Sequence, residues 1–273
     1  MGREIFTTVI RGQMILLGTG TSVGVPAIGC GCEVCTSSNP KNNRTRCSAI
    51  LGLPEGNLLI DTSPDMRQQL LRERIGIVHA VAYTHEHADH LFGLDDLRLM
   101  QFYLGGPLPI YCEELVEQRI RKSFDYAFDP PPNIHTGGVP KMTFKPIGPI
   151  NSGWKPFEVL GAKVTAVRQQ HGPNFETLGF RVGDVAYCTD VNDMPEESKQ
   201  HLQGLDTLVL DALRPDRHTT HFNLDEAIAL AEELEPRQTY FTHMCHSLEH
   251  EETNASLPEG IELAYDGLRI NLV

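Results

Sequence analysis

The sequence predicts an α/β protein in which layers of β-sheet are covered by helices, and three observations favour this class. Short apolar runs of strand length, bounded by Gly or Asp, recur along the 273 residues. Two longer segments between them carry apolar residues at helical spacing. The strand-like runs outnumber the helical segments, which is typical of sheets packed against helices.

A composition of 40% hydrophobic and 22% charged residues is that of an ordinary globular protein, and 273 residues suffice for one large core or two small ones. We expect residues 1–273 to form a single domain. The predicted strands lie at residues 13–20, 48–53, 57–63, 79–84, 108–112, 163–171, 177–190, 205–213 and 238–243.

The helices are predicted from their start and stop signals. Residues 63–76, "SPDMRQQLLRERIG", open with Ser-Pro and close on Gly. Residues 223–236, "NLDEAIALAEELEP", begin with an Asn that can cap a helix and end at a Pro. Residues 123–156 differ from both because they are rich in Pro and Gly. They are interpreted as a long surface connection or as a lid over a site, since long loops in compact domains are often functional.

Charge and cysteine content narrow the class of function. A formal net charge of −13 repels nucleic acid, whose binding depends on neutralising phosphates, so no nucleic-acid partner is expected. No apolar stretch is long enough to span a membrane or to form a signal-peptide core, so we expect a cytoplasmic protein. Seven cysteines, an odd number, argue against a disulfide framework and favour free or metal-bound thiolates.

Residue types that bind metals occur where the predicted strands end. Because catalytic groups commonly gather on loops at strand ends, we expect these side chains to converge at one edge of the sheets. They are Asp61, His85, His171, Asp190, Asp211 and His243.

The segment "HEHADH" concentrates four of these residue types directly after the apolar run 79–84: His85, His87, Asp89 and His90. Imidazole and carboxylate together suit zinc, manganese and iron. One catalytic ion needs only three protein ligands and a water. Four ligands here, with more at distant strand ends, therefore predict a pair of divalent ions.

A second cluster is "GVPAIGCGCEVC", in which Cys30, Cys32 and Cys35 lie close together. Three thiolates need a fourth ligand for a closed tetrahedral zinc site. His246 in "THMCH" is the expected fourth ligand, with Cys245 and Cys47 as competitors. A structural zinc in the loop of about residues 29–47 would tie that loop to the one that carries His243.

These motifs together resemble the metallo-β-lactamase fold superfamily. The double-metal segment "THEHADH" carries the resemblance, with Asp61 before it and with His171, Asp190 and His243 after later strands. The cysteine motif, "RTRCSAIL", "YCTD", "THMCH" and the ending "LPEGIELAYDGLRI" resemble the phosphoribosyl 1,2-cyclic phosphate phosphodiesterase branch, the PhnP family. The resemblance covers the chain from about residue 14 to its C-terminus.

The resemblance implies an αββα sandwich, with two mixed sheets packed face to face and helices on the outer faces. It also implies a ligand set and a homodimer. His85, His87 and His171 would hold one ion, Asp89, His90 and His243 the other, and Asp190 would bridge the two. Asp61 would orient a ligand imidazole.

The expected chemistry is the hydrolysis of a small phosphodiester substrate by a metal-bridging hydroxide, with Zn²⁺ or Mn²⁺ as the active-site ions. We expect catalytic roles for His221, Asp89 and Asp211. His221 is the candidate general acid, with His218 as its competitor. Arg214, its neighbour Arg217 and His218 are candidates for binding the substrate phosphate.

Three alternatives stay open at this point. The same ligand set would serve a tRNA 3′-processing nuclease, although the acidic charge weighs against one. It would also serve a lactonase, a thioesterase or a β-lactamase-type hydrolase. A non-catalytic metal-binding protein of cofactor biosynthesis is the third alternative.

Overall fold

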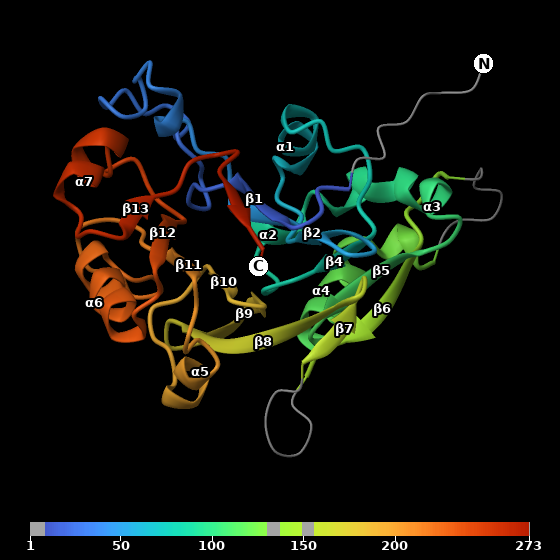
Figure 1. The fold of residues 1–273 in the computed structure, drawn as a ribbon. Coiled ribbons are helices and arrows are strands. Elements are labelled where there is room, and N and C mark those ends of the chain that lie inside the picture. The colour runs from blue at the N-terminus through green and yellow to red at the C-terminus, as the bar shows by residue number, and fades with distance from the viewer. Residues whose placement is uncertain (1–8, 130–136, 149–155, 273) are drawn as a thin grey trace.

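The computed structural model describes residues 9–129, 137–148 and 156–272. It consists of two seven-stranded β-sheets with helices on their outer faces (Figure 1). This arrangement confirms the predicted αββα sandwich. Within the described residues, every helix is too short or too polar to cross a membrane.

The first sheet has the strand order β14-β1-β2-β3-β4-β5-β6. β1, β2, β3 and β14 pair antiparallel, whereas β3 to β6 pair parallel. The strands are β1 (Gln13–Gly18), β2 (Ser48–Leu53), β3 (Gly56–Ile60), β4 (Ala80–Ala82), β5 (Leu108–Cys112), β6 (Met142–Pro146) and β14 (Arg269–Asn271).

The second sheet has the order β13-β12-β11-β10-β9-β8-β7. β7 to β10 pair antiparallel, and β10 to β13 pair parallel. The strands are β7 (Phe157–Val159), β8 (Ala162–His171), β9 (Phe175–Val182), β10 (Val185–Cys188), β11 (Thr207–Asp211), β12 (Gln238–Thr242) and β13 (Ile261–Leu263).

Helices connect the strands and cover the sheets. They are α1 (Met66–Arg72), α2 (Ala88–Leu91), α3 (Met100–Tyr103), α4 (Glu114–Ser123), α5 (Glu196–Gln200), α6 (Leu224–Leu234) and α7 (His250–Ser256). The described part of the chain also contains the 3₁₀ turns η1 (Pro40–Asn42), η2 (Leu94–Leu99) and η3 (Asp125–Ala127). Asn223 caps α6 as predicted. Its side chain accepts a hydrogen bond from the Glu226 amide at 2.8 Å, and the Glu226 carboxylate accepts one from the Asn223 amide.

The core lies between the sheets. Leu16 and Leu51 of the first sheet are buried in one apolar cluster with Phe180 and Phe241 of the second. A second cluster joins the outer face of the first sheet to α1, η2 and α4, and includes Leu59, Met66 and Ile120. The parallel strands β10 and β11 are buried along their whole length, as strands covered on both faces must be.

The segment 123–156, expected to be a connection or a lid, contains a strand that was not predicted. Met142–Pro146 forms β6, which pairs with β5 at the edge of the first sheet. Residues 130–136 and 149–155 of this segment lie outside the described residues, so the lid stays a prediction.

Candidate metal centre

The strand-end side chains converge as the sequence predicted. His85 lies shortly after β4, His171 ends β8, and Asp190 and His243 lie just beyond β10 and β12. Asp190 and His243 have left-handed backbone conformations, with φ of 56° and 60°. Such conformations cost free energy in residues other than glycine and cluster at functional sites. The backbone is therefore held in a strained shape where the chain presents these two side chains.

Two groups of ligand-type atoms lie side by side. One consists of His85, His87 and His171, and the other of Asp89, His90, Asp190 and His243. Within each group the candidate ligand atoms all lie within 4.8 Å of one another.

Asp190 joins the two groups because its two carboxylate oxygens face different partners. Its Oδ1 lies 3.9 Å from His85 Nε2 and 3.3 Å from His243 Nε2. Its Oδ2 lies 3.2 Å from His90 Nε2 and accepts from Thr189 Oγ1 at 2.7 Å. One carboxylate thus contacts histidines of both groups, which is the placement a bridging ligand requires.

Asp61, which follows β3, fixes the orientation of two of the histidines. Its Oδ2 lies 2.8 Å from His90 Nδ1, and the same oxygen accepts from Thr84 Oγ1 at 2.8 Å. Thr84 Oγ1 in turn lies 2.9 Å from His85 Nδ1. Both Nδ1 atoms are therefore engaged, and both Nε2 atoms face the site, which is how groups that hydrogen-bond to metal ligands orient them. Thr84 was not among the predicted residues, although it directly precedes His85.

The site has the properties of a cation site. The Nε2 atoms of His85, His90 and His243 are buried and have no hydrogen-bond partner among the described residues. A buried polar atom without a partner is costly, so such atoms call for a ligand. Burial lowers the pKa of His85 and of His243, which keeps their imidazoles neutral and able to bind a metal.

The surroundings of His90 also favour a positive charge at this site. Burial opposes a charged imidazole there, but the carboxylates of Asp190, Asp89 and Asp61 outweigh it and raise the pKa of His90 well above its usual value. Carboxylate and imidazole donors at this density fit divalent ions such as zinc or manganese. The donor set present here thus fits the expected metal ions.

His221 lies against the two groups and is oriented by Asp211. The two rings next to it belong to His243 and His171, at centroid distances of 4.4 and 4.7 Å. His221 Nδ1 lies 2.6 Å from Asp211 Oδ2. Burial lowers the pKa of His221 and raises the pKa of Asp211.

The competitor His218 lies farther out. Its ring centroid is 5.3 Å from that of His221, and its Nδ1 contacts Thr220 at the amide and the hydroxyl. Arg214 donates to the backbone carbonyls of Asp216 and Arg217 in its own loop. Among the described contacts, neither Arg214 nor Arg217 reaches the metal-ligand groups. A role of these residues in substrate binding therefore stays a prediction.

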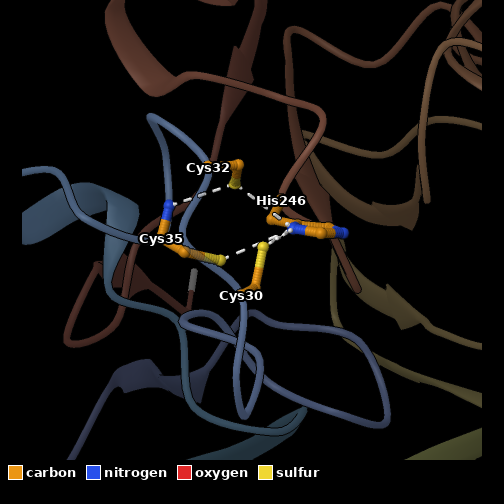
Figure 2. Close-up of side chains that lie close together, drawn as sticks. All are labelled: Cys30, Cys32, Cys35 and His246. Carbon is orange, nitrogen blue, oxygen red and sulfur yellow. Dashed lines mark hydrogen bonds between the residues drawn. The ribbon is translucent and has the colours of Figure 1, made fainter.

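The cysteine cluster closes around His246 (Figure 2). The Sγ atoms of Cys30, Cys32 and Cys35 lie 3.2, 3.4 and 3.5 Å from His246 Nδ1. Ligands of a tetrahedral zinc, with Zn–S near 2.3 Å and Zn–N near 2.0 Å, would have S···N separations of about 3.5 Å.

The structure distinguishes His246 from its two competitors for the fourth ligand position. Cys245 Sγ accepts from the Ser247 amide, and Cys47 is buried beside Thr242. Neither thiol belongs to the group formed by the other three cysteines and His246.

Hydrogen bonds tie the segment of residues 19–44 to the loop that carries His243. Met244, the residue after His243, donates to the Thr19 carbonyl at 2.9 Å and accepts from the Thr21 amide at 3.1 Å. The buried Arg44 donates to the carbonyls of Cys245 and Leu248 at 2.9 and 2.7 Å. The cysteine cluster joins the same two segments, because its member His246 lies three residues after His243.

Known proteins of similar sequence and structure agree with this geometry. A family model described as "Beta-lactamase superfamily domain" matches residues 56–244. A crystal structure titled as that of a new diphosphatase from the PhnP family is 42% identical, with a TM-score of 0.86, and the match covers 94% of this chain and 96% of that one. Zinc-bound PqqB from Methylobacterium extorquens, at 23% identity and a TM-score of 0.76, shares the fold over 95% of this chain and all of its own.

A curated relative from Porphyromonas gingivalis (strain ATCC BAA-308 / W83), named octanoyltransferase, is 36% identical over 259 residues. The match covers 94% of this chain but 51% of the relative, so the chain spans about half the length of that protein. From the superfamily match over residues 56–244 and the similarity to the diphosphatase, we conclude that the chain belongs to the PhnP family of the metallo-β-lactamase superfamily.

Proposed function

We propose that this chain is a phosphodiesterase that hydrolyses a small, cyclic phosphodiester such as phosphoribosyl 1,2-cyclic phosphate, with two divalent ions, Zn²⁺ or Mn²⁺, in its active site. The observation that carries the proposal is the placement of Asp190 between two groups of buried, unpartnered imidazole nitrogens. His85, His87 and His171 would hold one ion, and Asp89, His90 and His243 the other, with Asp190 shared. When bound, such ions polarise a phosphoryl oxygen and lower the pKa of a water.

The side chains themselves perform the remaining tasks. Asp61 and Thr84 hold the imidazoles of His90 and His85 in place, so that the ligand atoms need no rearrangement during the reaction. Asp211 engages His221 Nδ1, which leaves His221 Nε2 to give a proton to the departing oxygen of the substrate.

Similarity to the diphosphatase favours a second candidate within the same chemistry. That protein's name describes hydrolysis of a diphosphate, and its 42% identity over nearly the whole chain supports a phosphorus-centred reaction here. A diphosphate and a cyclic phosphodiester both place the scissile P–O bond at the metal ions. The formal charge of −13 weighs against the alternative of a tRNA substrate.

The test is an assay of the protein loaded with Mn²⁺ or Zn²⁺ against bis(p-nitrophenyl) phosphate and a ribose cyclic phosphate. We expect hydrolysis of both, and a loss on the order of 10³-fold in His87→Ala, because a ligand is removed from one ion. His201→Ala, at an exposed histidine, is the matched control and should keep full activity. Hydrolysis of a lactone or a pre-tRNA, with none of the phosphodiesters, would overturn the proposal.

The choice between the two candidate acids can be tested with His221→Ala and His218→Ala. We expect His221→Ala to lower kcat by about 10²–10⁴-fold, the range that general acid catalysis contributes, and His218→Ala by much less. The loss in His221→Ala should shrink for p-nitrophenyl esters, whose leaving group needs little protonation. An equal loss for good and poor leaving groups would contradict the assignment of His221.

A further inference from the structure

A large cavity lies beside the metal centre and has no role in the proposed chemistry. Its volume is about 800 Å³, which is within the range of pockets that bind whole small molecules. Its walls come from the start of α4, the end of β6 and the turn between β8 and β9. Its lining includes Glu86, Glu113, Glu114, Arg168, Phe175 and Glu176.

Phe175 connects the cavity to the metal centre. It pairs with His171 across the tight hairpin between β8 and β9. Its ring centroid lies 4.9 Å from that of His87 and 6.2 Å from that of His171. The same side chain lines the cavity and is 42% exposed, so part of the ring is available to a ligand. A substrate held at the metal centre would therefore extend over Phe175.

The charge of the cavity limits which substrate groups can bind in it. Four of its lining residues are glutamates and one is an arginine. The Arg168 guanidinium contacts Glu113 at 2.9 Å and Glu176 at 2.6 Å. Burial raises the pKa of Glu113 despite Arg168, and the charges of Glu176 and Glu86 add to the rise. The cavity therefore repels anions, including a second phosphate of a substrate.

We propose that this cavity binds the part of the substrate beyond the scissile phosphate, and that this part contains a planar, neutral or cationic ring with N–H donors, such as an amino-bearing nucleobase. The ring stacks on Phe175, and its N–H groups donate to the cavity carboxylates. Stacking of a base on an aromatic side chain strengthens binding by about 5–150-fold, enough to decide specificity. This inference rests on the proposed phosphodiesterase function and narrows its substrate class. It favours phosphodiesters of nucleosides over phosphoribosyl 1,2-cyclic phosphate, whose second phosphate the cavity carboxylates would repel.

The experiment compares three p-nitrophenyl phosphodiesters with the metal-loaded protein. The second ester group is methyl, 2-phosphoethyl or cytidine 5′-yl, and the leaving group is the same in all. We expect the cytidine ester to have the highest kcat/KM and the phosphoethyl ester the lowest. Phe175→Ala should lower the ratio of kcat/KM for the cytidine ester to kcat/KM for the methyl ester by about 10-fold. Phe175→Tyr, which keeps the ring, should retain the preference for cytidine.

A charge-reversal variant tests the claim that the cavity repels anionic substrate groups. Glu114→Lys, at an exposed position on α4, should raise kcat/KM for the phosphoethyl ester relative to the methyl ester. Equal kcat/KM for the cytidine and methyl esters in the unmodified protein would overturn the inference. An equal loss for both esters in Phe175→Ala would do the same, because it would mean that Phe175 only supports His87.

Binding of the product separates this inference from the proposed function. By calorimetry, cytidine 5′-monophosphate should bind the metal-loaded protein at least about 10-fold more tightly than ribose 5-phosphate, and Phe175→Ala should abolish the difference. This result without any diester hydrolysis would refute the phosphodiesterase and leave the binding site standing. Equal affinities, whatever the activity, would refute the binding site.

Discussion

Replacing Asp190 by Ala is expected to abolish phosphodiester hydrolysis, with a loss on the order of 10³-fold or more, and to remove metal from both halves of the centre. The reason is the position of its carboxylate, which lies within 4 Å of His85, His90 and His243 at once. Loss of any other ligand affects one group, whereas loss of Asp190 affects both. Activity and metal content should be measured on the same preparation.

Asp193→Ala is the matched control, because Asp193 is an exposed aspartate on the same loop. It should keep both activity and metal. Asp190→Asn guards against a folding defect, since it preserves the volume of the buried side chain and keeps one oxygen ligand. Normal metal content in Asp190→Ala, in a folded protein, would contradict the assignment of Asp190 as a shared ligand.

Cys32→Ser is expected to remove one zinc per chain and to lower stability markedly. A structural zinc contributes folding free energy directly, and the loss of a thiolate ligand weakens that contribution by several kcal/mol. For a protein of this size, about 3–5 kcal/mol corresponds to a fall in Tm of roughly 6–20 °C. Zinc analysis and thermal unfolding measure the two effects.

Cys245→Ser provides the comparison, because this half-buried thiol is adjacent to His246 in the chain but lies outside the cysteine cluster. It should keep its zinc and its Tm. We also expect Cys32→Ser to lose activity at temperatures where it is still folded, since the cluster supports the loop of His243. A Cys32→Ser protein with unchanged zinc content and Tm would show that the cluster of Cys30, Cys32, Cys35 and His246 holds no structural zinc.

The strands were predicted from apolar runs that end at Gly or Asp. The strands that were missed lack such a run. β2 and β5 were predicted with the bounds that the structure gives them. β6 was missed because its side chains are largely exposed and its segment is rich in Pro and Gly. β7, β13 and β14 have three residues each, too few to show a period. α6 was predicted because its cap, apolar stripe and stop all lie within one segment.

The candidate site was predictable to the extent that chemistry is encoded in residue type and local spacing. The segment "HEHADH" and the three cysteines predicted the two metal sites from the sequence. In the structure their predicted partners, which lie between residues 171 and 246, are next to them. Thr84 and Phe175 could not be predicted, because their roles come from contacts across the fold. Sequence alone left open the choices between His221 and His218 and between His246 and its competitors. The homodimer and the substrate contacts of Arg214 stay predictions.

The central claim is that Asp190 is shared by a pair of cations, and anomalous X-ray scattering from crystals of the Mn²⁺-loaded protein tests it most directly. We predict two anomalous peaks about 3.5–4 Å apart, one among His85, His87 and His171 and one among Asp89, His90 and His243, with the Asp190 carboxylate between them. A single peak, or two peaks with Asp190 turned away from one of them, would contradict the account.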